Sequence, residues 1–240
     1  MPAPTQVAPL AEEARIRAAY ARRDGADRYS WFNAAHLLAV QERERRTLAL
    51  LQRHGYQSLA DTTILEFGCG TGIWLREFLK WGARPANLAG IDLLEDRIAE
   101  ARRLCPPELT LTCASATEPL VPPRQFDIVL QSMVATSILD PAMRQALAGA
   151  MLTALRPGGM ILWYDYHTGN PRNRDVRAVT RREIGQLFPR CRIELQRITV
   201  APPLARLIAP RARWVYSLLE LVPIVKTHYL GVIRPLSGGQ

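Results

Sequence analysis

Residues 64–72 read Ile-Leu-Glu-Phe-Gly-Cys-Gly-Thr-Gly, and this stretch decides the fold class of the chain. The apolar run 62–67 predicts a buried strand, and the pattern 73–81 predicts a helix directly after it. Three glycines fill the turn between them. Because glycine has no Cβ, the backbone of such a turn can approach a ligand closely, and the following helix begins with unpaired N–H groups. The turn is therefore suited to hold a nucleotide-like cofactor.

The spacing of these glycines excludes two common phosphate-binding motifs. A dinucleotide fingerprint needs G-x-G-x-x-G, but the third glycine position counted from Gly68 is occupied by Ile73. A P-loop needs a glycine followed by lysine and then serine or threonine, and no lysine is near. The turn reads instead as E-x-G-x-G-x-G, beginning at Glu66.

A second segment, 87–92, is another short apolar strand that ends in an acid, Asp92. A carboxylate at this place can accept hydrogen bonds from both hydroxyls of a ribose. Residues 93–104 then predict a helix with one apolar face. The two segments together predict a strand–turn–helix–strand unit with its ligand at the strand ends.

The same alternation continues along the chain. Further strands are predicted at 109–114, 126–131 and 160–164, and a last strand at 227–233. A helix from 140 to about 155 has a proline near its first position, where proline is favoured. Strands alternating with helices predict an α/β fold.

Two stretches, Glu66 to Gly72 and Gly90 to Arg102, resemble the first two motifs of the class I S-adenosylmethionine (SAM) dependent methyltransferases. The resemblance covers roughly residues 60–165. It implies a doubly wound, Rossmann-like sheet of seven strands, mostly parallel with an antiparallel last strand, and helices on both faces. A weaker resemblance, in 163–174 and 227–231, is to methyltransferases of bacterial glycan or natural-product pathways.

The family resemblance also implies a set of cofactor contacts. In that family the glycine loop runs beside the amino acid part of SAM, and the strand-end carboxylate helps to hold its ammonium group. The family usually has Asp or Asn where this chain has Ser115, so the Ser115 hydroxyl or the N–H of Ala116 would take that role. The residues expected at the cofactor are Glu66, Gly68, Cys69, Gly70, Gly72, Asp92, Leu93, Ser115, Ala116, Gln131, Tyr20 and Tyr29.

The segment after the fifth strand is expected to meet the methyl acceptor, because ligands bind at the carboxyl ends of strands in open α/β sheets. Asp165 and His167 are the general-base candidates. The alternative for His167 is a loop histidine bonded to backbone. The residues expected to orient the acceptor are Tyr166, Asn170, Arg172, Asn173 and Arg174.

The chain is interpreted as one domain with three parts. Residues 1–56 hold two helical patterns, at 11–23 and 32–54, and form either a lid that closes over SAM or a fixed packing element. Residues 57–166 form the SAM-binding core, and 167–240 form the C-terminal part of the same domain, which includes an acceptor-side cap. Within the cap, 200–225 is apolar with prolines and arginines, which exclude a membrane span. This stretch either covers the acceptor pocket as a helix pair or rests on a lipid surface.

Charge is concentrated in the last quarter of the chain. Residues 166–240 hold thirteen Arg or Lys and four Asp or Glu, so they carry the whole net charge of +9. Arginine suits carboxylate and phosphate groups, which predicts a small anionic acceptor, whereas the alternative is a solvated basic surface. A nucleic-acid methyltransferase is disfavoured, because residues 130–133 read Leu-Gln-Ser-Met and not Asn/Asp-Pro-Pro-aromatic. The remaining alternative is a non-catalytic partner subunit with this fold.

The four cysteines form no C-x-x-C pair and show no metal-ligand spacing. They are interpreted as reduced residues of the core or of loops, with Cys113 on a buried strand, in a cytoplasmic protein without a metal. The first ten residues contain prolines and lack the apolar run of a signal peptide. The sequence as a whole predicts a SAM-dependent methyltransferase that acts on an oxygen or nitrogen of a small, anionic molecule, with no nucleic-acid partner.

Overall fold

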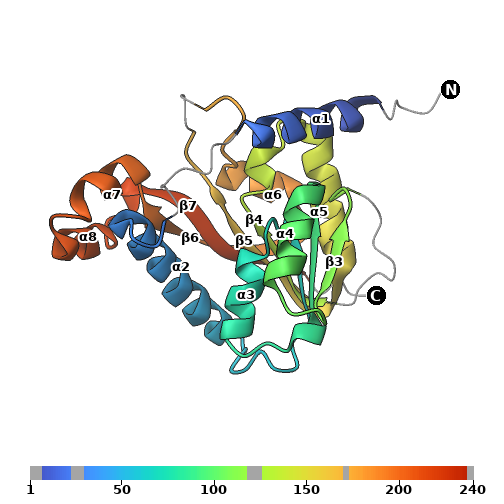
Figure 1. Ribbon diagram of the computed structural model, residues 1–240, viewed down its shortest axis with the longest axis horizontal. Coiled ribbons are helices and arrows are strands. Elements are labelled where there is room, and N and C mark those ends of the chain that lie inside the picture. Colours follow the sequence, from blue (N-terminus) through green and yellow to red (C-terminus); the bar gives the residue numbers. More distant parts are fainter. Residues whose placement is uncertain (1–6, 23–29, 118–125, 170–172, 237–240) are drawn as a thin grey trace.

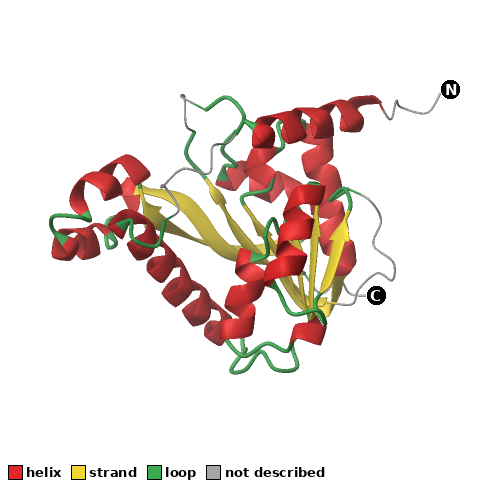
Figure 2. Cartoon of the chain, viewed as in Figure 1, coloured by secondary structure: helices red, strands yellow, loops and turns green. Residues whose placement is uncertain are grey.

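The computed structural model of the chain describes residues 7–22, 30–117, 126–169 and 173–236, with side chains from residue 10 onward. Its centre is a sheet of seven strands in the order β3-β2-β1-β4-β5-β7-β6 (Figures 1 and 2). The strands are β1 Ile64–Phe67, β2 Leu88–Asp92, β3 Thr110–Cys113, β4 Phe126–Ser132, β5 Leu155–Tyr166, β6 Cys191–Val200 and β7 Lys226–Pro235.

The pairing confirms the predicted fold class. The strands β1 to β5 pair in parallel, and β7 runs antiparallel to both β5 and β6. Sequence order along the sheet reverses between β1 and β4, so this is the point where an open α/β sheet forms a ligand crevice.

Helices cover both faces of the sheet (Figure 2). On one face α1, α5 and α6 share a core cluster that contains Phe67 and Trp163, and on the other face α2, α3 and α4 share a cluster that contains Ile64 and Phe78. The helices are α1 Val7–Ala21, α2 Ala34–Arg53, α3 Ile73–Lys80, α4 Glu95–Leu104, α5 Pro141–Ala154, α6 Arg181–Leu187, α7 Pro202–Ile208 and α8 Arg213–Leu219. Short 3₁₀ turns occur at Pro85–Asn87, Ala135–Ser137 and Pro223–Val225.

Two of the predicted strands differ from those in the structure, and β6 was not predicted. Strand β5 begins at Leu155, five residues before the predicted start, because the Pro157-Gly158-Gly159 segment continues the strand through a register shift against β4. A Cβ on Gly159 would lie 2.9 Å from the carbonyl oxygen of Phe126, which explains a glycine there. Strand β3 lies at the sheet edge, so Cys113 is exposed and the prediction of a buried strand is wrong.

The stretch 200–225 forms the helix pair α7 and α8, which leads into β7. The pair forms a third, smaller cluster with the beginning of α2, in which Tyr216 is fully buried against Ala35 and Ala209. It packs beside the end of β6, where Val200 belongs to the same buried cluster. Among the described residues, no helix is long and apolar enough to span a bilayer.

A buried ion pair joins α2 to the antiparallel end of the sheet. The fully buried Glu42 accepts a 2.9 Å hydrogen bond from the amide of Thr199, whose φ is +65°, and its other oxygen lies 3.7 Å from Nζ of the buried Lys226. Burial raises the pKa of Glu42, and the nearby Glu220 raises it further. The pair therefore fixes where α2 lies relative to β6 and β7.

We predict that Glu42→Ala lowers the free energy of unfolding by roughly 3 kcal/mol, because it leaves Lys226 as a buried charge without its partner. Urea denaturation measures the change. The control is Glu100→Ala, which removes an exposed i,i+3 pair with Arg103 and is expected to change nothing measurable. Equal stability of Glu42→Ala and the unmodified chain would show that the pair does not hold α2.

Candidate cofactor and acceptor site

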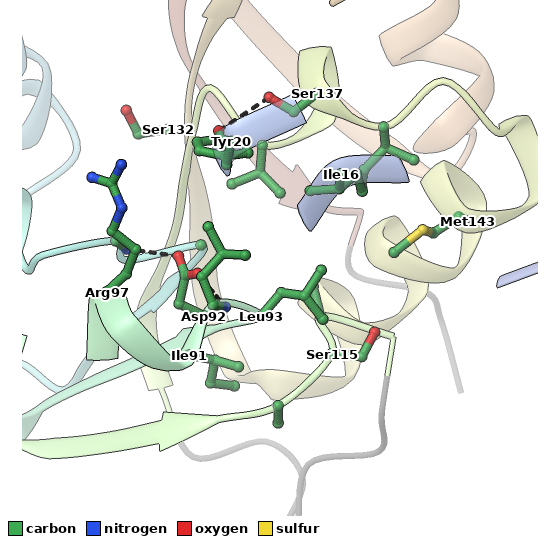
Figure 3. A pocket seen from close by; sticks show the side chains of 17 residues that line it. Ile16, Tyr20, Ile91, Asp92, Leu93, Arg97, Ser115, Ser132, Ser137 and Met143 are labelled. Atoms are coloured by element: carbon green, nitrogen blue, oxygen red, sulfur yellow. Dashed lines mark hydrogen bonds between the residues drawn. The ribbon is translucent and has the colours of Figure 1, made fainter. Parts of the chain in front are cut away.

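A cavity lies at the carboxyl ends of β1, β2 and β4, on the crevice where the strand order reverses. Figure 3 shows this cavity, whose lining comes from the glycine turn, the end of β2, the residues after β3, the residues after β4 and the helices α1, α4 and α5. The lining residues are Ile16, Tyr20, Gly68, Gly70, Ile91, Asp92, Leu93, Leu94, Arg97, Ala114, Ser115, Ala116, Ser132, Val134, Ser137, Ile138 and Met143.

The floor of the cavity is the glycine turn. Gly68, Gly70 and Gly72 have φ values of +67°, +52° and +74°, a region that other residues rarely adopt. A Cβ on Gly68 would collide with the side chain of Val134. Gly72 is the N-cap of α3, so the start of that helix lies behind the turn. Glycine is thus required at Gly68 both by conformation and by space.

Asp92 connects the two strand-end turns of the site. One carboxylate oxygen accepts a 2.7 Å hydrogen bond from the amide of Gly70, and the other accepts a 2.9 Å hydrogen bond from the amide of Leu94. Burial raises the pKa of Asp92, although these two amides and the Arg97 guanidinium act in the opposite direction. In Figure 3 the Asp92 side chain points into the middle of the cavity.

Glu66 lies one layer behind the cavity. Its side chain is 2 % exposed, and its Oε2 atom has no hydrogen-bond partner among the described residues. Burial, and secondarily the charge of Asp92, raises the pKa of Glu66 well above its usual range. A buried carboxylate oxygen without a donor is costly, so this atom fits a site that receives a cationic group from a ligand.

Arg43 of α2 approaches the same end of the site and was not expected from the sequence. Its guanidinium lies 4.7 Å from the ring centroid of Trp74 and 5.6 Å from that of Tyr164. The indole Nε1 of Trp74 donates a 2.8 Å hydrogen bond to the hydroxyl of Ser132, which lines the cavity. The positive charge of Arg43 lowers the raised pKa of Glu66, yet the two side chains are not ion-paired.

The opposite wall is apolar. Leu93, Ile138 and Met143 face the cavity beside Ala116 and the 6 % exposed Ser115, whose hydroxyl lies 2.9 Å from that of Thr117. A flat, weakly polar ring system fits such a wall.

Helix α1 forms the roof through Ile16 and Tyr20 (Figure 3). The Tyr20 hydroxyl lies 3.3 Å from the hydroxyl of Ser137, and Arg15 donates a 2.6 Å hydrogen bond to the Ser137 carbonyl. The Glu12 carboxylate accepts a hydrogen bond from the amide of Leu139. Although burial raises its pKa, the bonds from Arg15 and Leu139 hold the pKa of Glu12 below its usual value. The roof is thus attached to the turn after β4 by charged groups.

Gln131 and Asp165 lie under that turn and do not line the cavity. The amide oxygen of Gln131 accepts hydrogen bonds from the amides of Val134 and Ala135, at 3.1 and 3.2 Å. Asp165, 1 % exposed, accepts from the amide of Thr136 at 3.0 Å and from its neighbour in sequence, Tyr166, at 2.8 Å. Burial raises the pKa of Asp165 to about 7.

His167 is half-buried, and its ring stacks on Tyr229 with a centroid distance of 4.3 Å. Its Nε2 atom is buried without a hydrogen-bond partner in the described residues, and burial lowers its pKa. Tyr166 packs with its ring 4.0 Å from that of His228. Neither His167 nor Tyr166 lines the cavity. The predicted cofactor residues that do line it together are Asp92, Leu93, Ser115, Ala116, Tyr20 and two glycines of the turn, Gly68 and Gly70.

The loop 173–177 lies against the same turn after β4. The amide of Arg177 donates to the carbonyl of Thr136 at 2.9 Å, and Asp175 is paired with Arg22, just beyond α1. Arg174 is exposed, and the side chain of Asn173 accepts from the amide of Asp175. The predicted site residues Tyr29, Asn170 and Arg172 lie outside the described residues.

Cys69 is buried in the glycine turn, where its amide donates to the carbonyl of Ile91 at 2.9 Å, and burial raises the pKa of its thiol. The four cysteines are free. Within the described ranges, no group of three or more His, Cys, Asp or Glu could hold a metal ion.

Residues 64–159 match a family model described as "Methyltransferase domain". The match spans the glycine turn, Asp92 and the strands up to β5, and it agrees with the sheet order and the antiparallel β7. The chain therefore carries a SAM-dependent methyltransferase domain of class I, which confirms the predicted fold and cofactor. None of the curated proteins matches the sequence.

Solved structures of similar fold cover nearly the whole chain. The N-methyltransferase NodS from Bradyrhizobium japonicum, in complex with S-adenosylhomocysteine, is 15 % identical with a TM-score of 0.65, covering 92 % of this chain and 98 % of its own. The 1,6-didemethyltoxoflavin-N1-methyltransferase of Burkholderia thailandensis is 19 % identical with a TM-score of 0.63, covering 99 % and 94 %. The [4+2]-cyclase SpnF is 16 % identical with a TM-score of 0.59, covering 99 % of both chains, so this fold alone does not define a reaction.

We predict that Asp165 makes stability fall as the pH rises. Its pKa is 3.8 when unperturbed and about 7 when folded, so the folded state binds the extra proton between these values. The resulting stabilisation is present below the lower value and is lost as the pH rises through the upper one. The quantity to compare is the free energy of unfolding of the unmodified chain minus that of Asp165→Asn. This difference should be smaller at about pH 8 than at about pH 5.

Urea denaturation at both pH values measures this difference. Asp96→Asn removes one exposed carboxylate and controls for the loss of a charge. A difference that is the same at both pH values would mean that Asp165 is ionised throughout.

Proposed function

We propose that this chain transfers the methyl group of SAM to an oxygen or nitrogen of a small, anionic acceptor. The observation that carries the proposal is the cavity over the strand-order reversal, with Asp92 at its centre and the glycine turn as its floor. Four free cysteines and the need for SAM fit a cytoplasmic protein.

In the proposed binding mode the ribose lies on Asp92. A carboxylate has about four lone-pair sites, so its oxygens can accept from ribose hydroxyls while keeping the amides of Gly70 and Leu94. The adenine ring would lie against Leu93 and Met143, with Ser115 and Ala116 at its polar edge. Cys69 and Gly72 would support the loop from behind.

The amino acid end of SAM is a zwitterion, and near the cavity lie one acidic and one basic side chain that could bind it. Glu66 has a buried oxygen without a donor, and Arg43 has no ion-pair partner in the described residues. We propose that the ammonium group of SAM binds Glu66 and that its carboxylate binds Arg43. The ligand would then give each side chain a charged partner, which the two do not give each other. Gln131 would act indirectly, by shaping the turn beside Ser132.

SAM supplies a methyl group already activated on a sulfonium, so the protein mainly has to position the acceptor. A base is needed only for a nucleophile that keeps its proton. His167, with its lowered pKa and unpartnered Nε2, is neutral and fits that role better than Asp165, whose oxygens are held by backbone amides. Reaching the methyl group from its stacked position would require His167 to turn away from Tyr229.

The acceptor would enter between α1 and the loop 173–177, because both lie against the turn after β4. From their places in the sequence, we propose Tyr29 as a cofactor contact and Asn170 and Arg172 as acceptor contacts. Arg174 is exposed in this loop and would bind an anionic group, while Tyr166 and Asn173 would shape the entrance. A long RNA or DNA acceptor is the alternative that the net charge of +9 leaves open.

We predict that Asp92→Ala and Arg43→Leu weaken cofactor binding in different ways. Loss of a bond to a charged group should cost roughly 1–3 kcal/mol in each case. Asp92→Ala should weaken both S-adenosylhomocysteine and 5′-methylthioadenosine, because both contain the ribose. Arg43→Leu should weaken only S-adenosylhomocysteine, since 5′-methylthioadenosine lacks the amino acid end.

Isothermal calorimetry measures the four affinities. Arg53→Leu is the control, because Arg53 lies on the same helix but pairs with Glu194. Equal losses for both ligands in Arg43→Leu would remove Arg43 from the amino acid end, and unchanged binding in Asp92→Ala would remove Asp92 from the ribose.

We further predict that Arg174→Ala raises the KM for an anionic acceptor about tenfold and leaves the SAM affinity unchanged. Methyl transfer is measured with matched charged and neutral acceptors. The control is Arg190→Ala, which removes an exposed arginine just before β6, at the end of the strands remote from the loop that holds Arg174. Turnover that prefers neutral acceptors, or that follows long nucleic acid with a steep salt dependence, would contradict the proposed acceptor class.

A further inference from the structure

One end of the molecule exposes an unusual number of large apolar side chains. Eight of the twelve exposed large apolar side chains in the described residues fall in two short segments, 31–32 and 207–224. The highest exposures are 101 % for Phe32, 84 % for Ile224 and 70 % for Trp214 and Leu221. The others in the two segments are Trp31, Leu207, Leu218 and Val222. We call residues 31–32 and 202–225 the tip.

The two segments belong to one surface region. Residues 31–32 precede the first turn of α2, and Ala35 in that turn shares a buried cluster with Ala205 and Tyr216 of α7 and α8. Arg45 of α2 is paired with Glu220, at the end of α8. Figure 1 shows α7 and α8 at one extremity of the molecule with the beginning of α2 beside them.

The exposed charges on the tip are positive. Arg206, Arg211 and Arg213 are exposed, and the acid of this stretch, Glu220, has a side chain that is 13 % exposed and already paired with Arg45. Apolar side chains, tryptophan and arginine on the same short helices are the combination found where a protein lies in the headgroup layer of an anionic membrane. The indole of an exposed tryptophan suits this layer, where one side is apolar and the other is wet.

A second copy of the chain is a poorer occupant. A twofold contact through the tip would place the same arginines opposite one another, which is unfavourable without intervening acids. The exposed side chains also protrude: Phe32, at 101 %, is as exposed as an isolated residue. Protruding side chains can enter a soft lipid interface without needing a complementary pocket.

We propose that the tip docks on a bilayer surface that contains anionic lipids, with α7 and α8 lying in its headgroup layer. Each of these helices has seven residues, so the docking is peripheral. None of the tip residues that the structure describes lines the cofactor cavity, so the cavity stays open to SAM while the tip is docked. The proposal does not depend on the identity of the acceptor.

The experiment is co-sedimentation of the full chain with two kinds of vesicle, one of phosphatidylcholine alone and one of equal parts phosphatidylcholine and phosphatidylglycerol. The chain should bind the anionic vesicles and be released by high salt. Ile224→Glu should lower this binding about tenfold, because it places an anion at the most exposed aliphatic position of the tip. Arg211→Ala combined with Arg213→Ala should lower the binding and its dependence on salt.

Leu104→Glu is the matched control, because Leu104 is exposed at 43 % on α4, away from the tip. It should leave vesicle binding unchanged, and all variants should keep S-adenosylhomocysteine binding, which shows that they fold. Three results would overturn the proposal: no binding of the chain to anionic vesicles, equal loss in Leu104→Glu and Ile224→Glu, or a dimer in light scattering that Ile224→Glu abolishes while vesicle binding is absent.

Discussion

The site depends on one carboxylate that joins two turns. Asp92, at the end of β2, accepts hydrogen bonds from the amide of Gly70 on the glycine turn and from the amide of Leu94 at the start of the next helix. The positive φ of Gly70 turns its amide toward β2, and the short strand ends at the same height as β1 because Phe67 pairs with Ile91. The Asp92 carboxylate therefore orients two backbone turns and also lines the ligand cavity.

Acidic side chains also hold the backbone turn after β4, on the other side of the cavity. Asp165 from below and Glu12 from above both accept from amides of the turn after β4, at Thr136 and Leu139 respectively. Burial and hydrogen bonding have opposite outcomes for the two: the pKa of Asp165 is raised to about 7, whereas that of the less buried Glu12 is lowered. This turn therefore connects the sheet to α1.

The sequence predicted the half of the site that lies on local motifs. A glycine turn after an apolar strand has a fixed geometry, so the lining by Gly68 and Asp92 followed from spacing alone. Arg43 could not be found in this way, because its approach to Trp74 depends on how α2 packs across the sheet. Strand β6 was missed for a related reason: it is an edge strand whose exposed arginines break the apolar pattern that identifies buried strands. Asp165 was found as a strand-end acid, but its burial is a property of the packed turn.

Two side chains of opposite character that lack a charged partner among the described residues lie close to the place where a ligand is expected. The Oε2 atom of Glu66 is buried without a donor, and Arg43 stacks on aromatic rings without an ion pair in the described part of the chain. The buried oxygen of Glu66 costs folding free energy, because a desolvated polar atom is compensated only by a partner. Glu42, equally remote from water, differs in having a charged neighbour: one oxygen accepts from the amide of Thr199, and the other lies 3.7 Å from Nζ of Lys226 without a hydrogen bond from any described residue. A zwitterionic ligand that binds both Glu66 and Arg43 would therefore stabilise the folded state as well as bind to it.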